Sequence, residues 1–270
     1  MAVTQTFPGA AAPKPARRPH RPRLRPIAAG LASAAVGLLV WESLARLSGL
    51  PAFILPPPAR VASRFLEVLA DGSLWRHTQA TLVEIVAGLA LGGTVAAILG
   101  YVVAKSPSLE RALTPYIVAS QSIPVVAIAP LLVIWLGPGV LSKVVVCALI
   151  VFFPLLINAV VGLRSVPAEL RDLLHSLEAS RWQTFVKLEA PAALPVLLGG
   201  LKIGATLAVI GAVVGELVGA DRGLGFLVNV GRGQYDTALV FVAVGALVTL
   251  ALSLYGGVAL LERTLLRWRK

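Results

Sequence analysis

Four charged residues stand inside long apolar runs of the sequence: Glu42, Glu84, Lys202 and Glu216. An ionisable side chain in a membrane segment is costly, and where it occurs it usually belongs to a proton relay, an ion site or a substrate pathway. We expect Glu42 and Glu84, near the ends of their runs, to reach water or headgroups, and Lys202 to extend its ammonium group to the interface. Two interpretations stay open for Glu216, which either lines a pathway or caps the loop that follows it.

The residue patterns of catalysis and nucleotide binding are missing from the sequence. Its three histidines, His20, His77 and His175, lie in different loops, and no His or Cys pair has the spacing of a metal site. The phosphate-binding pattern G-x-x-x-x-G-K-[ST] does not occur. The single cysteine, Cys147, is expected to be a small packing residue. We therefore predict a non-catalytic chain without a metal or cofactor, which needs an ATPase on another polypeptide if ATP drives it.

The composition predicts an all-α integral membrane protein. Hydrophobic residues make up 57% of the chain and charged residues 14%, with a mean hydropathy of +0.84. Uncharged runs of about 20 residues recur, whereas the alternating strands of a barrel are absent. The net charge of +11 comes from Lys and Arg beside the apolar runs. That pattern is typical of membrane topology and not of nucleic-acid binding.

Six apolar segments are long enough to cross a bilayer: residues 27–47, 82–104, 112–136, 144–163, 195–218 and 237–261. Most of the 24 Lys and Arg residues lie on the side of the termini, which predicts that both termini are cytoplasmic. The sequence then divides into four parts: a disordered, basic, Pro-rich tail attracted to anionic lipid (1–26), a first span with an outer amphipathic connector (27–73), the main transmembrane domain (74–263) and a basic cytoplasmic end (264–270).

The segment between the fourth and fifth spans, residues 165–195, is charge-rich and amphipathic, and we call it the elbow. Four of its residues have the i, i+3, i+4, i+7 spacing of one helix face: Leu170, Leu173, Leu174 and Leu177. Ser180 and Gln183 form a capping box that starts a second helix, which Pro191 and Pro195 are expected to end. We expect the apolar stripe to hold to the bundle while the polar face meets a partner.

The third and fourth predicted spans contain prolines, which free backbone carbonyls that neighbouring helices or a wet cavity must satisfy. Either these spans face the interior of an assembly, or they are kinked packing helices. The first interpretation gives a candidate translocation pathway: Gln121, Ser122, Pro124, Asn158 and Glu216.

The elbow resembles the cytoplasmic signature of the permease subunits of binding-protein-dependent ABC importers with the type I fold. That signature reads roughly E-A-A, then G, then I-x-L-P, and corresponds here to residues 172–195. The resemblance covers about residues 74–263. Four further stretches are similar to the branch for nitrate, taurine, aliphatic sulfonates and thiamine-pyrimidine precursors: residues 121–130, 153–158, 199–204 and 211–225.

The resemblance implies a bacterial inner-membrane permease that passes a small solute from an extracytoplasmic solute-binding protein into the cytoplasm. Its implied partners are a dimer of cytoplasmic ABC ATPase subunits and a second permease copy, as a homodimer. It implies a coupling helix at residues 167–191, with these contacts to the ATPase: Asp172, Leu173, Leu174, His175, Ser176, Leu177, Glu178, Ala179, Ser180 and Arg181. Several cargoes stay open, with mild preference for an organic ring such as a pyrimidine or a riboflavin-like compound. The alternative function is an ion-gradient-driven secondary transporter.

The sequence departs from the signature at two places. Leu173 and Leu174 replace the small alanines, which implies a bulkier contact or burial against the permease's own helices. Glu178 replaces the glycine of the signature. Glycine adopts a left-handed conformation without steric cost, whereas a residue with a side chain is destabilised there by about 1 kcal/mol or more. Either the elbow is less sharp here, or it tolerates strain.

Overall fold

The computed structural model describes residues 24–267, without the side chains of residues 24–28 and 31. Every regular element in this range is helical, so the predicted all-α fold is confirmed. In chain order the elements are α1 (Leu24–Leu47), α2 (Pro58–Ala70), α3 (Ser73–Lys105), α4 (Pro107–Gln121), α5 (Val125–Leu136), α6 (Val140–Arg164), α7 (Ala168–Ser176), α8 (Arg181–Thr184), the π-helix η1 (Phe185–Glu189), α9 (Ala190–Gly219), α10 (Leu224–Gly233) and α11 (Thr237–Leu265). Helix α1 starts inside the predicted tail 1–26, most of which lies outside the described residues.

Four of the described helices are long and apolar enough to cross a membrane: α3, α6, the continuous helix from α8 to α9, and α11. They correspond to the second, fourth, fifth and sixth predicted spans. The third predicted span is not straight, because α4 and α5 meet at an angle of 87°. Pro124 lies at this break in an extended conformation, and its ring disfavours a helical residue before it. The structure thus has four such helices, or five if the bent pair is one span.

The helix that follows the capping box does not end at Pro191 and Pro195, contrary to our expectation. The box itself is present, and the helix continues through both prolines to Gly219. The wider π-turn of η1 lies directly before Pro191, and the Ala190 N–H bonds to the Phe185 carbonyl across this turn. A wider turn gives the first proline ring room beside the preceding carbonyls, which explains why the helix is not broken.

Helices α3, α6 and α9 pack along one another and form the centre of the bundle. Small residues permit this close approach. A Cβ at Gly88 of α3 would lie 2.2 Å from the Cβ of Cys147, and one at Gly211 of α9 would lie 2.8 Å from its Cα. Cys147 on α6 is completely buried between them, which confirms its predicted packing role.

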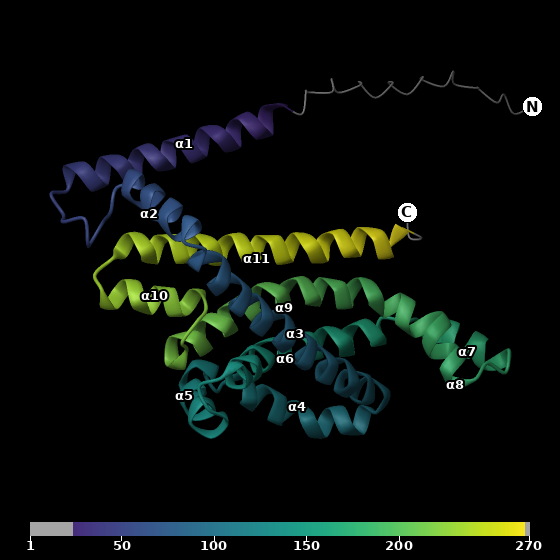
Figure 1. Ribbon diagram of the computed structural model, residues 1–270. Helices are drawn as coiled ribbons and strands as arrows, with labels where there is room; N and C mark the ends of the chain where they lie inside the picture. The colour runs from purple at the N-terminus through teal and green to yellow at the C-terminus, as the bar shows by residue number, and fades with distance from the viewer. Residues whose placement is uncertain (1–23, 268–270) are drawn as a thin grey trace, which may run out of the picture.

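The bundle has two distinct ends (Figure 1). The elbow helices α7 and α8 project from one end, where the C-terminus of the described chain also lies, and we call it the elbow end. Helices α5 and α10 lie at the opposite end, which we call the α10 end. The fold therefore has two end surfaces formed by different helices.

Candidate functional site

The turn between α7 and α8 is sharp, and Glu178 adopts the left-handed conformation at its centre with φ +54°. The Ala179 N–H bonds to the Leu174 carbonyl and the Glu178 N–H to the His175 carbonyl, each at 3.0 Å. These two bonds form a Schellman motif, whose left-handed position is usually a glycine. Of the two interpretations of Glu178, the structure supports the second: the turn keeps its sharpness and the backbone tolerates strain.

The apolar stripe of the elbow faces outward. Its large side chains are exposed to the following extents: Leu170 44%, Leu173 55%, Leu177 67%, Trp182 71% and Val186 45%. Our expectation that the stripe holds to the bundle is therefore wrong, and only Leu174 and Arg171 of α7 are half-buried. The bulky Leu173 is free to contact a partner and is not buried by the chain's own helices.

Ionic contacts fix the base of the elbow, and we call Glu189, Lys105 and Arg171 the elbow clamp. Glu189 is 1% exposed and binds the Lys105 ammonium of α3 at 2.5 Å. The Arg171 guanidinium of α7 lies 3.4 Å from Glu189 and donates to the Leu163 carbonyl at the end of α6 at 2.7 Å. The clamp thus joins the elbow to the ends of two long helices.

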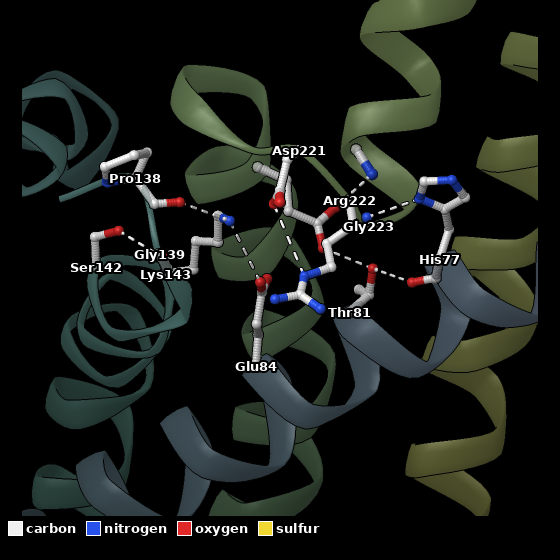
Figure 2. Close-up of polar contacts among 12 residues, drawn as sticks. His77, Thr81, Glu84, Pro138, Gly139, Ser142, Lys143, Asp221, Arg222 and Gly223 are labelled. Atoms are coloured by element: carbon white, nitrogen blue, oxygen red, sulfur yellow. Dashed lines mark hydrogen bonds and ion pairs between the residues drawn. The ribbon is translucent and has the colours of Figure 1, made fainter.

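A second ionic cluster lies at the α10 end and is completely buried. It comprises Glu84 of α3, Lys143 of α6 and Glu216 of α9, each at most 1% exposed, and we call it the buried triad. The Lys143 ammonium lies 3.7 Å from a Glu84 oxygen and donates to the Pro138 carbonyl at 3.1 Å. Figure 2 shows the Glu84 and Lys143 side chains pointing toward each other from neighbouring helices.

The triad also holds the loop that precedes α10. Glu216 accepts hydrogen bonds from the Thr81 hydroxyl at 2.6 Å and from the Gly225 N–H. Thr81 in turn accepts from the Leu224 N–H at 2.8 Å. The Gly223 N–H donates to Nδ1 of His77 at 3.0 Å (Figure 2). Three successive N–H groups of the loop are therefore bound by side chains of α3 and α9.

A family model described as "Binding-protein-dependent transport system inner membrane component" matches residues 81–267. The chain belongs to this family. It is a permease subunit of an ABC importer, which passes a small solute from an extracytoplasmic binding protein into the cytoplasm. The resemblance of the elbow and the predicted transport function are thereby confirmed.

Two relatives and one solved structure support the assignment. The riboflavin transport system permease protein RibX of Chloroflexus aurantiacus is 50% identical over 231 residues, 86% of each chain. The formylaminopyrimidine transport permease protein ThiX of Halalkalibacterium halodurans is 38% identical, over 86% of this chain and 92% of its own. An inward-facing structure of the MetNI methionine ABC transporter aligns with a TM-score of 0.58 at 20% identity, over 72% of this chain and 94% of that one. This last match shows a shared fold.

The structure brings the predicted coupling residues of this permease together on one projection. Residues 172–181 form the end of α7, the Schellman turn and the start of α8. Within it, Ser180 makes both bonds of the capping box with Gln183. The contact of this segment with an ATPase stays a prediction, for which the geometry supplies an exposed surface on a fixed base.

The predicted pathway residues differ in their exposure and contacts. Gln121, Ser122 and Pro124 are exposed at the break between α4 and α5. Asn158 is half-buried and donates to the Pro154 carbonyl at 2.8 Å. Glu216 is fully buried, and its contacts fit the interpretation that it caps a loop. A pathway through these residues stays a prediction.

Two expectations about charged residues need correction. Glu84 does not reach water, because it is buried in the triad beside Lys143. Lys202 does not simply extend to the interface but pairs with Glu262 of α11, both being only partly exposed. The sequence did not predict the triad because Lys143 lies just outside the predicted span 144–163, and only its position beside Gly215 of α9 reveals the packing. The described residues contain no His, Cys, Asp and Glu group suited to a metal ion.

Proposed function

We propose that the elbow couples this permease to a separate cytoplasmic ATPase subunit through its apolar stripe. The observation that carries the proposal is the exposure of Leu173 and Leu177, at 55% and 67%. Exposed apolar patches mark interaction sites, and an amphipathic helix in a groove is a common mode of recognition. Because the elbow clamp links this surface to α3 and α6, motion of the ATPase would be transmitted to the bundle.

The elbow end then faces the cytoplasm of a bacterium, and the α10 end faces outward across the inner membrane. The excess of Lys and Arg on the elbow side supports this orientation. Six crossings result if α1 and the bent pair α4–α5 each cross the bilayer once. Both termini would then be cytoplasmic.

A second copy of the permease completes the transporter. One elbow engages one ATPase subunit, whereas ATP hydrolysis by ABC ATPases is expected to need a dimer. Two identical permease copies, related by a twofold axis, would supply the two elbows and enclose a central path between them. The homodimer is therefore the simplest assembly.

The extracytoplasmic binding protein would dock at the α10 end. There α2 is held to the N-terminus of α11 by Arg64, which lies 2.8 Å from Asp236. The hydrogen bond with Glu67, followed by the charge of Asp236, raises the pKa of the Arg64 guanidinium, so this link is always charged. A fixed platform of α2, α10 and the loop before α10 suits a docking surface for a soluble partner.

We propose riboflavin, or a similar planar heteroaromatic compound, as the cargo. The 50% identity to RibX over 86% of both chains supports this class. A free cation within the spans would favour an oxyanion, but Lys202 of the fifth span is paired with Glu262. This pairing favours an uncharged cargo over nitrate or a sulfonate.

A substitution in the stripe tests the coupling proposal. Leu173→Asp should weaken the affinity for the ATPase, measured by co-purification, about tenfold or more. The reason is that a charge in an apolar contact costs ~1.4 kcal/mol or more of binding free energy. Glu169→Ala, on the polar face of the same helix, should leave the association intact. Equal ATPase binding by the Leu173→Asp variant and the unchanged protein would refute the role of the stripe.

Reconstitution with the cognate binding protein tests the cargo. The binding protein and ATP should drive uptake of labelled riboflavin into proteoliposomes, with unlabelled riboflavin competing and taurine not competing. Uptake of taurine or a sulfonate in preference to riboflavin would refute the assigned class. Uptake without ATP and ATPase would contradict the importer mechanism itself.

A further inference from the structure

The charges of the buried triad do not balance if all three groups are ionised. Two carboxylates and one ammonium would leave a net negative charge among side chains that are at most 1% exposed. An uncompensated charge in such surroundings is strongly destabilising. We propose that Glu84 carries a proton, so that the triad is electrically neutral.

The hydrogen-bond pattern assigns the proton to Glu84. Both Glu216 oxygens accept hydrogen bonds, one from the Thr81 hydroxyl and one from the Gly225 N–H, as an ionised carboxylate does. Neither Glu84 oxygen receives a hydrogen bond from any N–H or O–H group of the described chain. The Lys143 ammonium, at 3.7 Å, is too far from Glu84 for a hydrogen bond.

Glu84 and Glu216 are buried in the same cluster, and Lys143 can balance the charge of only one of them. Two buried carboxylates in one cluster would also repel each other. A single proton on Glu84 removes this repulsion, as in other carboxyl pairs that share one site. Glu216 then keeps its charge and balances that of Lys143.

Other groups near the triad do not provide the missing charge. Cys147 of α6 is buried as a neutral packing residue. His77, two turns before Glu84 on α3, accepts the Gly223 N–H and is stacked on Phe226 with 5.7 Å between ring centroids. Arg222 lies beside Asp221 at 3.8 Å, and both are largely exposed. The neutralising positive charge is therefore a proton.

A neutral triad can remain inside the apolar bundle and hold the loop of residues 221–225 against α3. On the proposed function, this loop lies under the docking surface of the binding protein, so the protonated pair keeps that surface in place. This consequence rests on the proposed function. The proton does not, because burial and hydrogen bonding alone require it.

Infrared spectroscopy of the purified chain tests the proposal without transport. A protonated carboxyl group has a C=O stretch separate from that of carboxylates. At neutral pH the unchanged protein should show such a band, slow to shift in D₂O, and Glu84→Gln should lose it. The matched control is Glu189→Gln in the elbow clamp, which should keep the band because it leaves Glu84 and Glu216 unchanged.

A second variant tests charge balance directly. Lys143→Met removes the cation, so Glu216 must also take up a proton and the band should grow roughly twofold. Thermal unfolding of each variant shows whether it is folded, and Gln retains the volume and the donor of a protonated Glu84. The proposal is overturned if the unchanged protein lacks the band, if Glu84→Gln retains it, or if a folded Lys143→Met variant leaves it unaltered.

Discussion

The two buried ionic clusters of this permease have opposite compositions. The triad at the α10 end has two acids and one base, Lys143, and none of its side chains is more than 1% exposed. The elbow clamp has one buried acid, Glu189, and two bases that reach the surface, since Lys105 is 44% and Arg171 39% exposed. One cluster is sealed inside the bundle, and the other is open to water on its basic side.

This difference in exposure implies that the contacts of the triad are permanent, whereas those of the elbow clamp are adjustable. Breaking a sealed ion pair leaves a buried charge, whereas exposed cations are rehydrated when they lose a partner. The α10 end is therefore held rigidly by the triad. The elbow clamp fixes the base of the elbow, but water can hydrate its two cations, so their contacts with Glu189 can change at a smaller cost than those of the triad. This property suits the proposed coupling to an ATPase.

Removing the acid from each cluster should have the most unequal effects. Glu216→Ala leaves the Thr81 hydroxyl and the Gly225 N–H without their buried acceptor and removes the charge that balances Lys143, so it should lower the free energy of unfolding by about 3–5 kcal/mol. Glu189→Ala should cost about 1 kcal/mol, because Lys105 can turn to water. Thermal and denaturant unfolding in detergent measure both. Equal losses would show that the two clusters do not differ in the way proposed.

The contact between the loop and the triad can be broken without changing any charge. A Cβ at Gly223 would lie 2.2 Å from the Glu216 carboxyl group, and this glycine has φ +120°. Gly223→Ala should therefore cost about 3–5 kcal/mol from overlap and backbone strain together. Gly137→Ala is the matched control, because Gly137 has φ +83° but nothing within 4 Å.

The control separates strain from overlap. We expect Gly137→Ala to cost about 2 kcal/mol from its backbone alone, because φ +83° with ψ 165° is a conformation nearly restricted to glycine. If both variants lose equally in thermal unfolding, the loop is not pressed against Glu216 and the α10 end is less rigid than described. A larger loss of stability in Gly223→Ala than in Gly137→Ala would support rigid packing of the loop against the triad.

At the elbow end, the larger effect should be on coupling and the smaller on stability. Arg171→Ala removes the link from α7 to Glu189 and to the Leu163 carbonyl. Receptor-stimulated uptake should fall about tenfold, equivalent to ~1.4 kcal/mol of coupling, with little change in unfolding temperature. Uptake and ATP hydrolysis are measured together, and hydrolysis should persist. A loss of stability as large as that of Glu216→Ala would contradict the comparison.

Local sequence patterns were sufficient to predict the elbow and the family. The leucine spacing of α7 and the box of Ser180 and Gln183 involve residues within one or two helical turns, where the chain itself fixes the geometry. The all-α membrane fold follows from composition in the same way. Family membership followed from the elbow and the stretches around it.

Contacts between helices were not predictable from the same patterns. Hydropathy predicts that α3 and α6 are buried but not their relative register, so it cannot pair Glu84 with Lys143. The direction of the elbow stripe was wrong for a related reason: periodicity shows that Leu173 and Leu177 share a face, but not which surface that face meets. The bend at Pro124 shows that a proline can divide one hydropathy peak into two helices.

The smallest expected effect concerns the strained turns, which occur at both ends. Tyr235, directly after α10, also has a left-handed conformation, with φ +56°. Its turn has the same Schellman pattern as that of Glu178, because the Asp236 N–H donates to the Gly231 carbonyl at 2.8 Å. Glu178 is exposed and packs on little, so Glu178→Gly should stabilise the chain by about 1 kcal/mol.

Tyr235→Gly relieves the same strain but removes an edge contact with Phe53, whose ring centroid is 6.2 Å away. We expect its net effect in thermal unfolding to be near zero, because the lost aromatic contact offsets the relief. If Glu178→Gly also alters uptake per ATP hydrolysed, the glutamate shapes the contact with the ATPase. If uptake is unchanged while stability rises, Glu178 only strains the turn, and the adjustable character of the elbow end depends on the clamp alone.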